Sequence, residues 1–235
     1  MSKINVEYGD CVPQDIPGRE FYREAMVDPL LKPWLIPSEL TSLYSIVAST
    51  TLVDVQGVYS LHRLTKQCLH IPGEFWECGV FRGGTAELTA LMMENQDEVT
   101  PKTLRLFDTF EGMPKTSEEH DLHKEGDFSN TSWSFIQYIF ASHPFTHLHK
   151  GFIPDTFKGL EESKIAFMHC DLDIYQSILD CLAFCYPRMS RGGVMLFDDY
   201  GTPTCPGARK AIDEFFSDKP EQIFYLSMQA FVVKL

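Results

Sequence analysis

Three aspartates follow two apolar runs and could hold a metal ion. Asp171 follows the run 165–170, and Asp198 and Asp199 follow the run 194–197, with Asp198 27 residues after Asp171. If the two runs form adjacent parallel strands, the carboxylates meet and repel one another strongly unless a cation lies between them. Oxygen ligands without a thiolate suit Mg²⁺, with Mn²⁺ or Ca²⁺ as substitutes. Helix capping is the alternative, but it does not explain an adjacent pair together with the Asp-x-Asp of residues 171 and 173.

A glycine-rich run begins at Glu77, where another apolar run ends, and continues to Thr85. Its spacing is E-x-G-x-x-x-G-G, whereas dinucleotide-binding folds show G-x-G-x-x-G. An acid at this strand end repels phosphate and attracts an ammonium group. A cofactor with a cationic amino-acid end therefore fits better than a dinucleotide, although a glycine-rich turn that only packs is the alternative.

Asp108 stands at the end of the next apolar run, 104–107, and is followed by Thr109. In nucleotide-binding sheets, an acid in this position accepts hydrogen bonds from the ribose hydroxyls. Asp108 lies 31 residues after Glu77, about the length of one strand–helix–strand unit. An aspartate after a strand caps a helix just as often, but its pairing with Glu77 favours the ribose role.

Short apolar runs alternate with helical patterns from Gly73 onward, which is typical of an α/β fold with a parallel sheet covered on both faces. We expect strands at 74–78, 104–107, 147–149, 165–170 and 194–197, and helices at 85–94, 131–142, 174–186 and 208–216. The runs 223–226 and 230–233 predict an antiparallel hairpin at the C-terminus. Residues 1–36 are interpreted as an irregular arm, followed by helices over 38–47 and 58–69. Together these features predict a single domain of residues 1–235, with an N-terminal arm and helices (1–72) and a cofactor- and metal-binding core (73–235).

Composition limits the function and the surroundings of the chain. The formal net charge is -13, so nucleic acid and anionic membranes are unfavourable partners. No stretch is apolar enough to span a membrane, and the polar residues 2–10 do not resemble a secretory signal. The seven cysteines show no disulfide framework spacing, and C-x-x-C and H-E-x-x-H zinc motifs are absent. We therefore expect a cytoplasmic protein with reduced thiols.

The motifs, taken in order, resemble those of the macrocin O-methyltransferase family, which comprises metal-dependent sugar O-methyltransferases of macrolide and aminocoumarin pathways. The resemblance runs from about Gly73 to Phe216 and includes E-C-G-V-x-x-G-G, F-D-T-F-E-G-M-P, G-D-F-x-N-T-S, H-x-D-x-D-x-Y and F-D-D-Y-G with C-P-G-A-R-K-A-I-D-E-F-F. It implies a Rossmann-like fold that binds S-adenosylmethionine, with N-terminal helical additions. It also implies that residues 126–132 close over the cofactor and that the protein forms a homodimer.

The resemblance implies a role for each candidate residue. Glu77 and Gly79 would touch the methionine end of S-adenosylmethionine, and Asp108 would hold its ribose. Mg²⁺ would be bound by Asp171, Asp198 and Asp199, while Asp173 would be the general base, with Asp171 as the other catalytic candidate. The full set of expected cofactor contacts is Glu77, Gly79, Val80, Gly83, Gly84, Thr85, Asp108, Thr109 and Asp171.

The expected reaction is methylation of a hydroxyl on a sugar or glycosylated small molecule, with Mg²⁺ and a carboxylate base assisting deprotonation. A catechol-type O-methyltransferase acting on an aromatic diol is the nearest alternative. A metal-dependent hydrolase would have no use for Glu77 and Asp108, and an inactive cofactor-binding module would not need the clustered aspartates. The polar segment 115–130 has few apolar anchors, so we expect it to be a mobile lid near the acceptor.

Overall fold

The computed structural model describes residues 32–95 and 102–235. The chain divides into two compact units, residues 1–42 and residues 43–235, and the boundary falls inside helix α2 (Glu39–Val47). The described part of the first unit contains a single 3₁₀ turn, η3 (Pro33–Leu35), and the first residues of α2. The predicted arm therefore lies mostly outside the described residues, and the prediction of a single domain with a boundary near residue 72 stays a prediction.

The second unit alternates strands and helices along the chain. After α2 come α3 (Val55–Cys68), β1 (Glu74–Cys78), α4 (Gly84–Glu94), β2 (Leu104–Asp108), α5 (Trp133–Phe140), β3 (Thr146–Lys150), η4 (Asp155–Phe157), β4 (Ile165–Cys170), α6 (Tyr175–Cys185), η5 (Tyr186–Arg188), β5 (Met189–Phe197), α7 (Pro206–Phe216), β6 (Phe224–Leu226) and β7 (Gln229–Val233). The α/β fold expected from the sequence is confirmed, including the C-terminal hairpin.

The strands form one sheet in the order β3-β2-β1-β4-β5-β7-β6. The first five strands are parallel, and β7 pairs antiparallel to both β5 and β6. The chain proceeds outward from β1 to β2 and β3, then returns to place β4 on the other side of β1. This reversal of strand order creates a crevice beyond the carboxyl ends of β1 and β4, where ligands bind in open α/β sheets.

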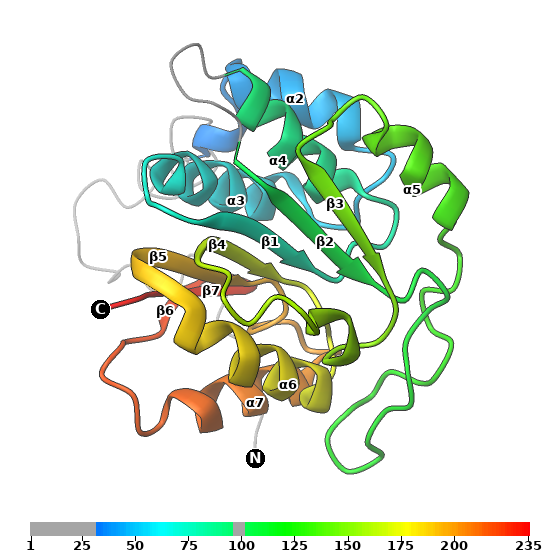
Figure 1. The fold of residues 1–235 in the computed structure, drawn as a ribbon, viewed down its shortest axis with the longest axis vertical. Coiled ribbons are helices and arrows are strands. Elements are labelled where there is room, and N and C mark those ends of the chain that lie inside the picture. The colour runs from blue at the N-terminus through cyan, green and yellow to red at the C-terminus, as the bar shows by residue number, and fades with distance from the viewer. Residues whose placement is uncertain (1–31, 96–101) are drawn as a thin grey trace, which may run out of the picture. The chain divides into compact units, whose positions relative to one another are not determined.

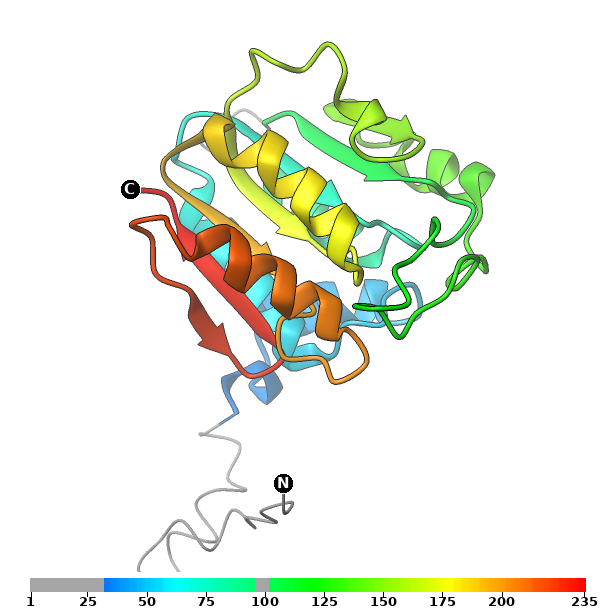
Figure 2. The same ribbon diagram turned by 90° about the horizontal axis from the view of Figure 1, so that it is seen from below.

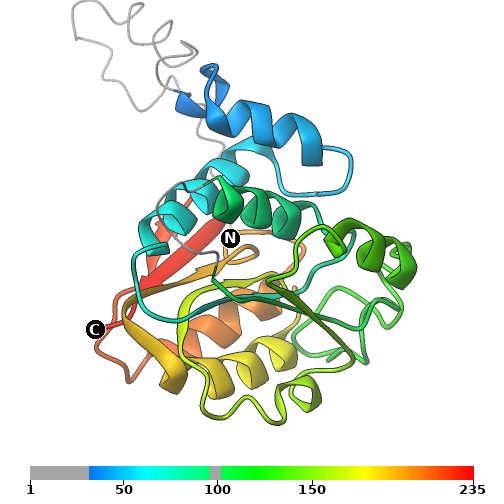
Figure 3. The same ribbon diagram turned by 45° about the horizontal axis from the view of Figure 1, so that its top comes forward.

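Helices cover both faces of the sheet, with α3 and α4 on one face and α6 and α7 on the other (Figure 1, Figure 3). Helices α6 and α7 lie side by side (Figure 2). Burial on both faces explains why β4 is apolar and buried along its whole length. The core beneath α6 and α7 is built around large side chains such as Trp76, Phe107 and Phe197, which fix the positions of the strand ends.

Strand β5 begins five residues earlier than the expected start at residue 194. The sequence shows Gly192-Gly193 there, which suggests a turn, but the strand continues through both glycines with a shift in its pairing to β4. A Cβ atom on Gly193 would lie 2.9 Å from the carbonyl oxygen of Ala166, so the close approach of the two strands requires a glycine. Among the helices of the described residues, none has the length and apolar character needed to cross a bilayer.

Candidate active site

A cleft of about 460 Å³ lies at the carboxyl ends of the strands, at the point where the strand order reverses. The turns after β1 and β4 meet tightly there. The N–H of Asp171 donates to the carbonyl oxygen of Cys78 over 2.8 Å. Gly79 has φ +87°, and a Cβ atom on it would lie 1.7 Å from the carbonyl oxygen of Asp171. Only glycine fits this position, which explains the first glycine of the sequence motif.

Most of the residues predicted from the sequence meet in this cleft. Those that line it are Gly79, Val80, Gly84, Thr85, Asp108, Thr109, Asp171, Asp173, Asp198 and Asp199. Glu77 and Gly83 lie just behind the lining, where Glu77 is 1% exposed and Gly83 is the left-handed N-cap of α4. The cleft is also lined by residues that sequence reasoning did not assign, including 50–54 between α2 and α3, and Gln229 at the start of β7.

Glu77 is buried but has polar neighbours. The hydroxyl of Thr85 donates to Glu77 Oε1 over 2.8 Å, and Nδ1 of His169 lies 3.4 Å from Glu77 Oε2. The other ring nitrogen of His169 lies 3.6 Å from Asp198 Oδ1. Burial disfavours the charged imidazolium, but Asp198 and Glu77 outweigh it and raise the pKa of His169 to about 10. His169 thus lies between the acid of the glycine-rich run and an acid of the aspartate cluster.

Asp108 fastens the glycine-rich turn. Its Oδ2 accepts hydrogen bonds from the N–H groups of Val80 and Phe81 over 2.7 and 2.9 Å. Its Oδ1 accepts one from the N–H of Phe110 over 2.6 Å. Asp108 also accepts a hydrogen bond from the hydroxyl of Thr109 at Oδ1 over 3.4 Å. It therefore holds the β1–α4 turn to the β2 end, and it is itself part of the cleft lining.

The aspartates after β4 and β5 come together as expected from parallel pairing. Oxygen atoms of Asp171, Asp173 and Asp199 lie within 4.8 Å of one another. Removal from water is the largest cause that raises the pKa of Asp171 and of Asp199, and the neighbouring carboxylates raise both pKa values further. Asp199 Oδ2 is buried without a hydrogen-bond partner. These oxygens suit a divalent cation, because a cation would relieve both the repulsion and the missing partner.

Asp198 is not part of this compact oxygen group. Its Oδ1 accepts a hydrogen bond from Nε2 of Gln229 over 2.5 Å and is near His169. The compact oxygen group therefore includes Asp173, whereas the sequence prediction paired Asp198 with Asp171 and Asp199. The metal set Asp171, Asp198 and Asp199 stays a prediction.

Asp173 has φ +58°, in the left-handed region that non-glycine residues rarely adopt. Its carboxylate accepts a hydrogen bond from the thiol of Cys205 over 3.4 Å. Burial is the main cause that raises the pKa of Asp173. The tight turn lets Asp173 lie three residues beyond the end of β4 while its side chain still reaches the aspartate cluster. Its role as the general base stays a prediction.

The segment 115–130 forms a long loop between β2 and α5 (Figure 1). Its base is closed by paired backbone hydrogen bonds between Met113 and the 126–127 turn. Asp121 accepts hydrogen bonds from the N–H of Ser117 and from the N–H of Tyr175 at the start of α6, each over 2.9 Å. Beyond the loop, the hydroxyl of Thr131 donates to the carbonyl of Phe81. The ring of Phe128 packs edge-on against that of Phe81, with centroids 5.9 Å apart. The loop is therefore held by a few polar bonds and one aromatic contact, and its residues His123 and Phe128 line the cleft.

Most of the chain matches one known protein family. Residues 45–223 match the family described as Macrocin-O-methyltransferase (TylF). The chain belongs to the macrocin O-methyltransferase family. The protein is therefore an S-adenosylmethionine-dependent methyltransferase. The resemblance read from the motifs is therefore confirmed.

Individual relatives of this protein have low sequence identity to it. It is 28% identical over 187 residues to the mycinamicin III 3''-O-methyltransferase of Micromonospora griseorubida, covering 73% of this chain and 72% of the relative. It is 28% identical over 171 residues to the 8-demethyl-8-(2,3-dimethoxy-alpha-L-rhamnosyl)-tetracenomycin-C 4'-O-methyltransferase of Streptomyces olivaceus, covering 67% and 65%. The calicheamicin methyltransferase CalS11 has a similar fold, with a TM-score of 0.69, 19% identity and 99% of both chains covered.

Proposed function

We propose that this enzyme transfers a methyl group from S-adenosylmethionine to a hydroxyl of a sugar or glycosylated small molecule, with Mg²⁺ bound by Asp171, Asp198 and Asp199. The observation that carries the proposal is the meeting of the aspartate cluster with the glycine-rich turn in one cleft. A cofactor site and a cation site in the same cleft suit a transfer reaction in which a hydroxyl must lose its proton. The rhamnosyl-tetracenomycin 4'-O-methyltransferase named above supports a glycoside as the acceptor class.

The residues present fit both groups. Gly79, Val80 and Gly84 expose the turn after β1 to the cleft, and the carboxylate of Glu77 lies directly behind this lining. The partnerless Asp199 Oδ2 and the crowded carboxylates offer oxygen ligands to a hard cation. When bound, S-adenosylmethionine supplies a methyl group on a sulfonium, and Mg²⁺ supplies a Lewis acid that makes a nearby hydroxyl more acidic.

The residues of the chain have separate roles in this mechanism. Glu77 and Asp108 orient the cofactor at the ends of β1 and β2. Asp173 takes the proton of the acceptor hydroxyl, and its raised pKa makes its carboxylate a stronger base than an ordinary aspartate. Positioning of donor and acceptor in the cleft contributes much of the rate enhancement.

The rim of the cleft supports an acceptor with an apolar portion. Leu52, Phe152 and Met228 all line the cleft, and their exposed fractions are 72%, 53% and 44%. Exposed apolar side chains at a cleft mouth are typical of a binding surface for an apolar ligand. A sugar attached to an apolar aglycone would place its hydroxyls near the aspartates and its aglycone on this rim.

The test is methyl transfer from radiolabelled S-adenosylmethionine to a panel of glycosides and a parallel panel of catechols. We expect product with glycosides in the presence of Mg²⁺, loss of product with a chelator, and recovery when Mg²⁺ is restored. Asp173→Asn should bind the cofactor as the native enzyme does but transfer no methyl group. Full activity after chelation would contradict the metal role, and activity confined to catechols would contradict the acceptor class.

A further inference from the structure

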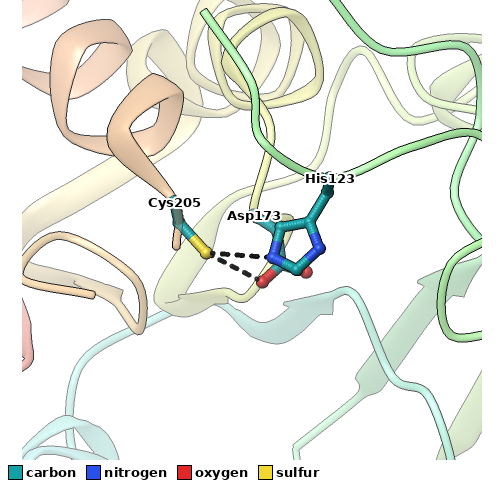
Figure 4. A group of neighbouring side chains, drawn as sticks. All are labelled: His123, Asp173 and Cys205. Carbon is teal, nitrogen blue, oxygen red and sulfur yellow. Dashed lines mark hydrogen bonds between the residues drawn. The ribbon is translucent and has the colours of Figure 1, made fainter. Parts of the chain in front are cut away.

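A second set of metal-binding side chains lies next to the aspartate cluster. The sulfur of Cys205 lies 3.4 Å from Asp173 Oδ1 and 3.6 Å from His123 Nε2 (Figure 4). These three atoms all lie within 4.8 Å of one another. His123 belongs to the loop between β2 and α5, Asp173 to the β4–α6 turn, and Cys205 to the N-cap of α7. Because the ligands come from three separate segments, the absence of C-x-x-C and H-E-x-x-H does not argue against a site here.

The separations match a tetrahedral zinc site. Zinc binds thiolate sulfur at about 2.3 Å and imidazole nitrogen at about 2.0 Å, so tetrahedral coordination separates these two atoms by about 3.5 Å. Carboxylate oxygen, at a similar distance from zinc, gives nearly the same separation from sulfur. The observed 3.6 and 3.4 Å therefore need little rearrangement to admit an ion.

His123 is also oriented as a zinc ligand would be. Its Nδ1 lies 3.2 Å from Asp127 Oδ2, an oxygen that also accepts a hydrogen bond from the N–H of Lys124 over 2.9 Å. When Nδ1 carries the proton and donates it to Asp127, the lone pair of Nε2 faces the thiol. A carboxylate behind a histidine ligand is the usual arrangement at zinc sites, because it fixes the tautomer and the orientation of the ring.

We propose that His123, Asp173 and Cys205 bind a thiophilic divalent cation of the Zn²⁺ class at a site adjacent to the Mg²⁺ site, since Asp173 also lies within 4.8 Å of Asp171 and Asp199. On binding, the thiol loses its proton to solvent and the sulfur–metal bond replaces the S–H bond. The mixed sulfur, nitrogen and oxygen ligands favour Zn²⁺ or Co²⁺ over Mg²⁺. The bound cation links the 115–130 loop to the β4–α6 turn.

One consequence rests on the proposed function. Asp173 is the proposed base, and a cation on its Oδ1 removes that oxygen from the acceptor hydroxyl. Zn²⁺ should therefore inhibit methyl transfer supported by Mg²⁺. The site then acts as an inhibitory switch. A chelator that binds Zn²⁺ more tightly than Mg²⁺ should reverse the inhibition.

The binding test uses Co²⁺, whose bond to a thiolate absorbs light through charge transfer. Titration of the metal-free full-length protein with Co²⁺ should produce this absorption to saturation, and Zn²⁺ should remove it by displacement while Mg²⁺ should not. Cys205→Ala should abolish the absorption, and Cys68→Ala, which changes a buried cysteine of α3 away from the site, should keep it. An absorption that never appears, or that survives in Cys205→Ala, would overturn the site.

The histidine and its partner provide a second, independent measurement. Asp127→Asn should weaken Zn²⁺ binding about 10- to 100-fold, the usual effect of removing the carboxylate behind a histidine ligand. His120→Ala is the matched control, since His120 lies in the same loop but packs on Tyr175, with ring centroids 4.4 Å apart, and its Zn²⁺ affinity should equal that of the native protein. Equal affinities for Asp127→Asn and the native protein would contradict the assignment of His123.

Inhibition is measured separately, as the Zn²⁺ concentration that halves the rate of each variant relative to its own rate without Zn²⁺. Zn²⁺ should inhibit the native enzyme, and the Cys205→Ala variant should need a higher Zn²⁺ concentration for the same loss of rate. Charge-transfer absorption without inhibition would overturn the switch while leaving the binding site. An absence of methyl transfer under Mg²⁺ would instead refute the proposed function, and the Co²⁺ result would stand independently. Circular dichroism confirms folding, and His123→Asn replaces Cys205→Ala if the latter does not fold.

Discussion

Nδ1 of His169 lies 3.4 Å from Oε2 of Glu77, and neither side chain is more than 2% exposed. The two residues are direct neighbours in the pairing of β4 with β1, so the sheet itself holds them together. Since the same ring also faces Asp198, this histidine connects the proposed cofactor site to the proposed metal site.

Replacing His169 should be strongly destabilising. His169→Gln leaves Glu77 buried without its cation, and loss of one member of a buried ion pair costs about 3 to 5 kcal/mol. The raised pKa of His169 means that its contribution is fully present below the ordinary histidine pKa and is lost as the pH rises through about 10. The gap between native and variant in the free energy of unfolding, measured with urea, should therefore shrink between neutral pH and pH 10. His147→Gln, at an exposed histidine, should show no gap; a gap for His169→Gln that stays constant with pH would contradict the ion pair.

Mg²⁺ should stabilise the folded protein, and more so at higher pH. The pKa values of Asp171 and Asp199 are raised by burial and by neighbouring carboxylates. A raised pKa stabilises the folded state below the ordinary aspartate pKa of about 3.9, and this contribution is lost as the pH rises through the folded-state pKa. The metal-free protein should therefore lose stability with rising pH, and Mg²⁺ at 100 times its Kd should restore about 2.7 kcal/mol.

Thermal melts with and without Mg²⁺, near pH 6 and near pH 8, measure this effect. Asp199→Asn should reduce the Mg²⁺-induced rise in melting temperature, because it removes a predicted ligand. Asp155→Asn, at an exposed aspartate of η4, is the control and should respond like the native protein. An equal rise in Asp199→Asn and native protein would argue against Asp199 as a ligand.

Asp108→Ala should weaken S-adenosylmethionine binding by about 1 to 3 kcal/mol, the cost of leaving polar groups without a partner. The substitution removes the proposed ribose ligand and also frees the N–H groups of Val80 and Phe81. Asp108→Asn keeps an acceptor oxygen for the turn and should lose less affinity. Calorimetry measures both variants, with the exposed Glu111→Gln as control, and unchanged affinity in Asp108→Ala would remove the ribose assignment.

The segment 115–130 should exchange its amide hydrogens faster in the free protein than in the complex with S-adenosylhomocysteine. Its anchors are a few polar contacts, above all those of Asp121, and such contacts open at low cost. Asp121→Ala should speed exchange around Ser117 and Tyr175, whereas Glu125→Ala, at an exposed residue of the same loop, should not. Equal protection with and without ligand would contradict the lid.

The strand-end acids and the glycine-rich turn of this site can be predicted from sequence patterns, because each pattern spans only a few neighbouring residues. Glu77 and Asp108 are among the last two residues of their strands, and Asp171 and Asp198 directly follow theirs. The alternation of strands and helices is therefore enough to collect these acids at one edge of a parallel sheet. Gly79 can be recognised from the sequence motif, although the contact that requires a glycine there, with the backbone of Asp171, is a tertiary one. The strand limits were also predicted closely, except where β5 continues through its paired glycines.

The α/β alternation, the strand-end acids and the glycine-rich turn can be predicted from the sequence, since all of these follow from residue type and spacing along the chain. The contacts of His169 and Cys205 with other segments could be found only in the folded structure. His169 reaches both Glu77 and Asp198 because β4 lies between β1 and β5, and Cys205 meets Asp173 and His123 across 32 and 82 residues of sequence. Contacts over such separations depend on strand order, register and loop path. These arise from packing of the whole unit and are not encoded in a periodic sequence pattern.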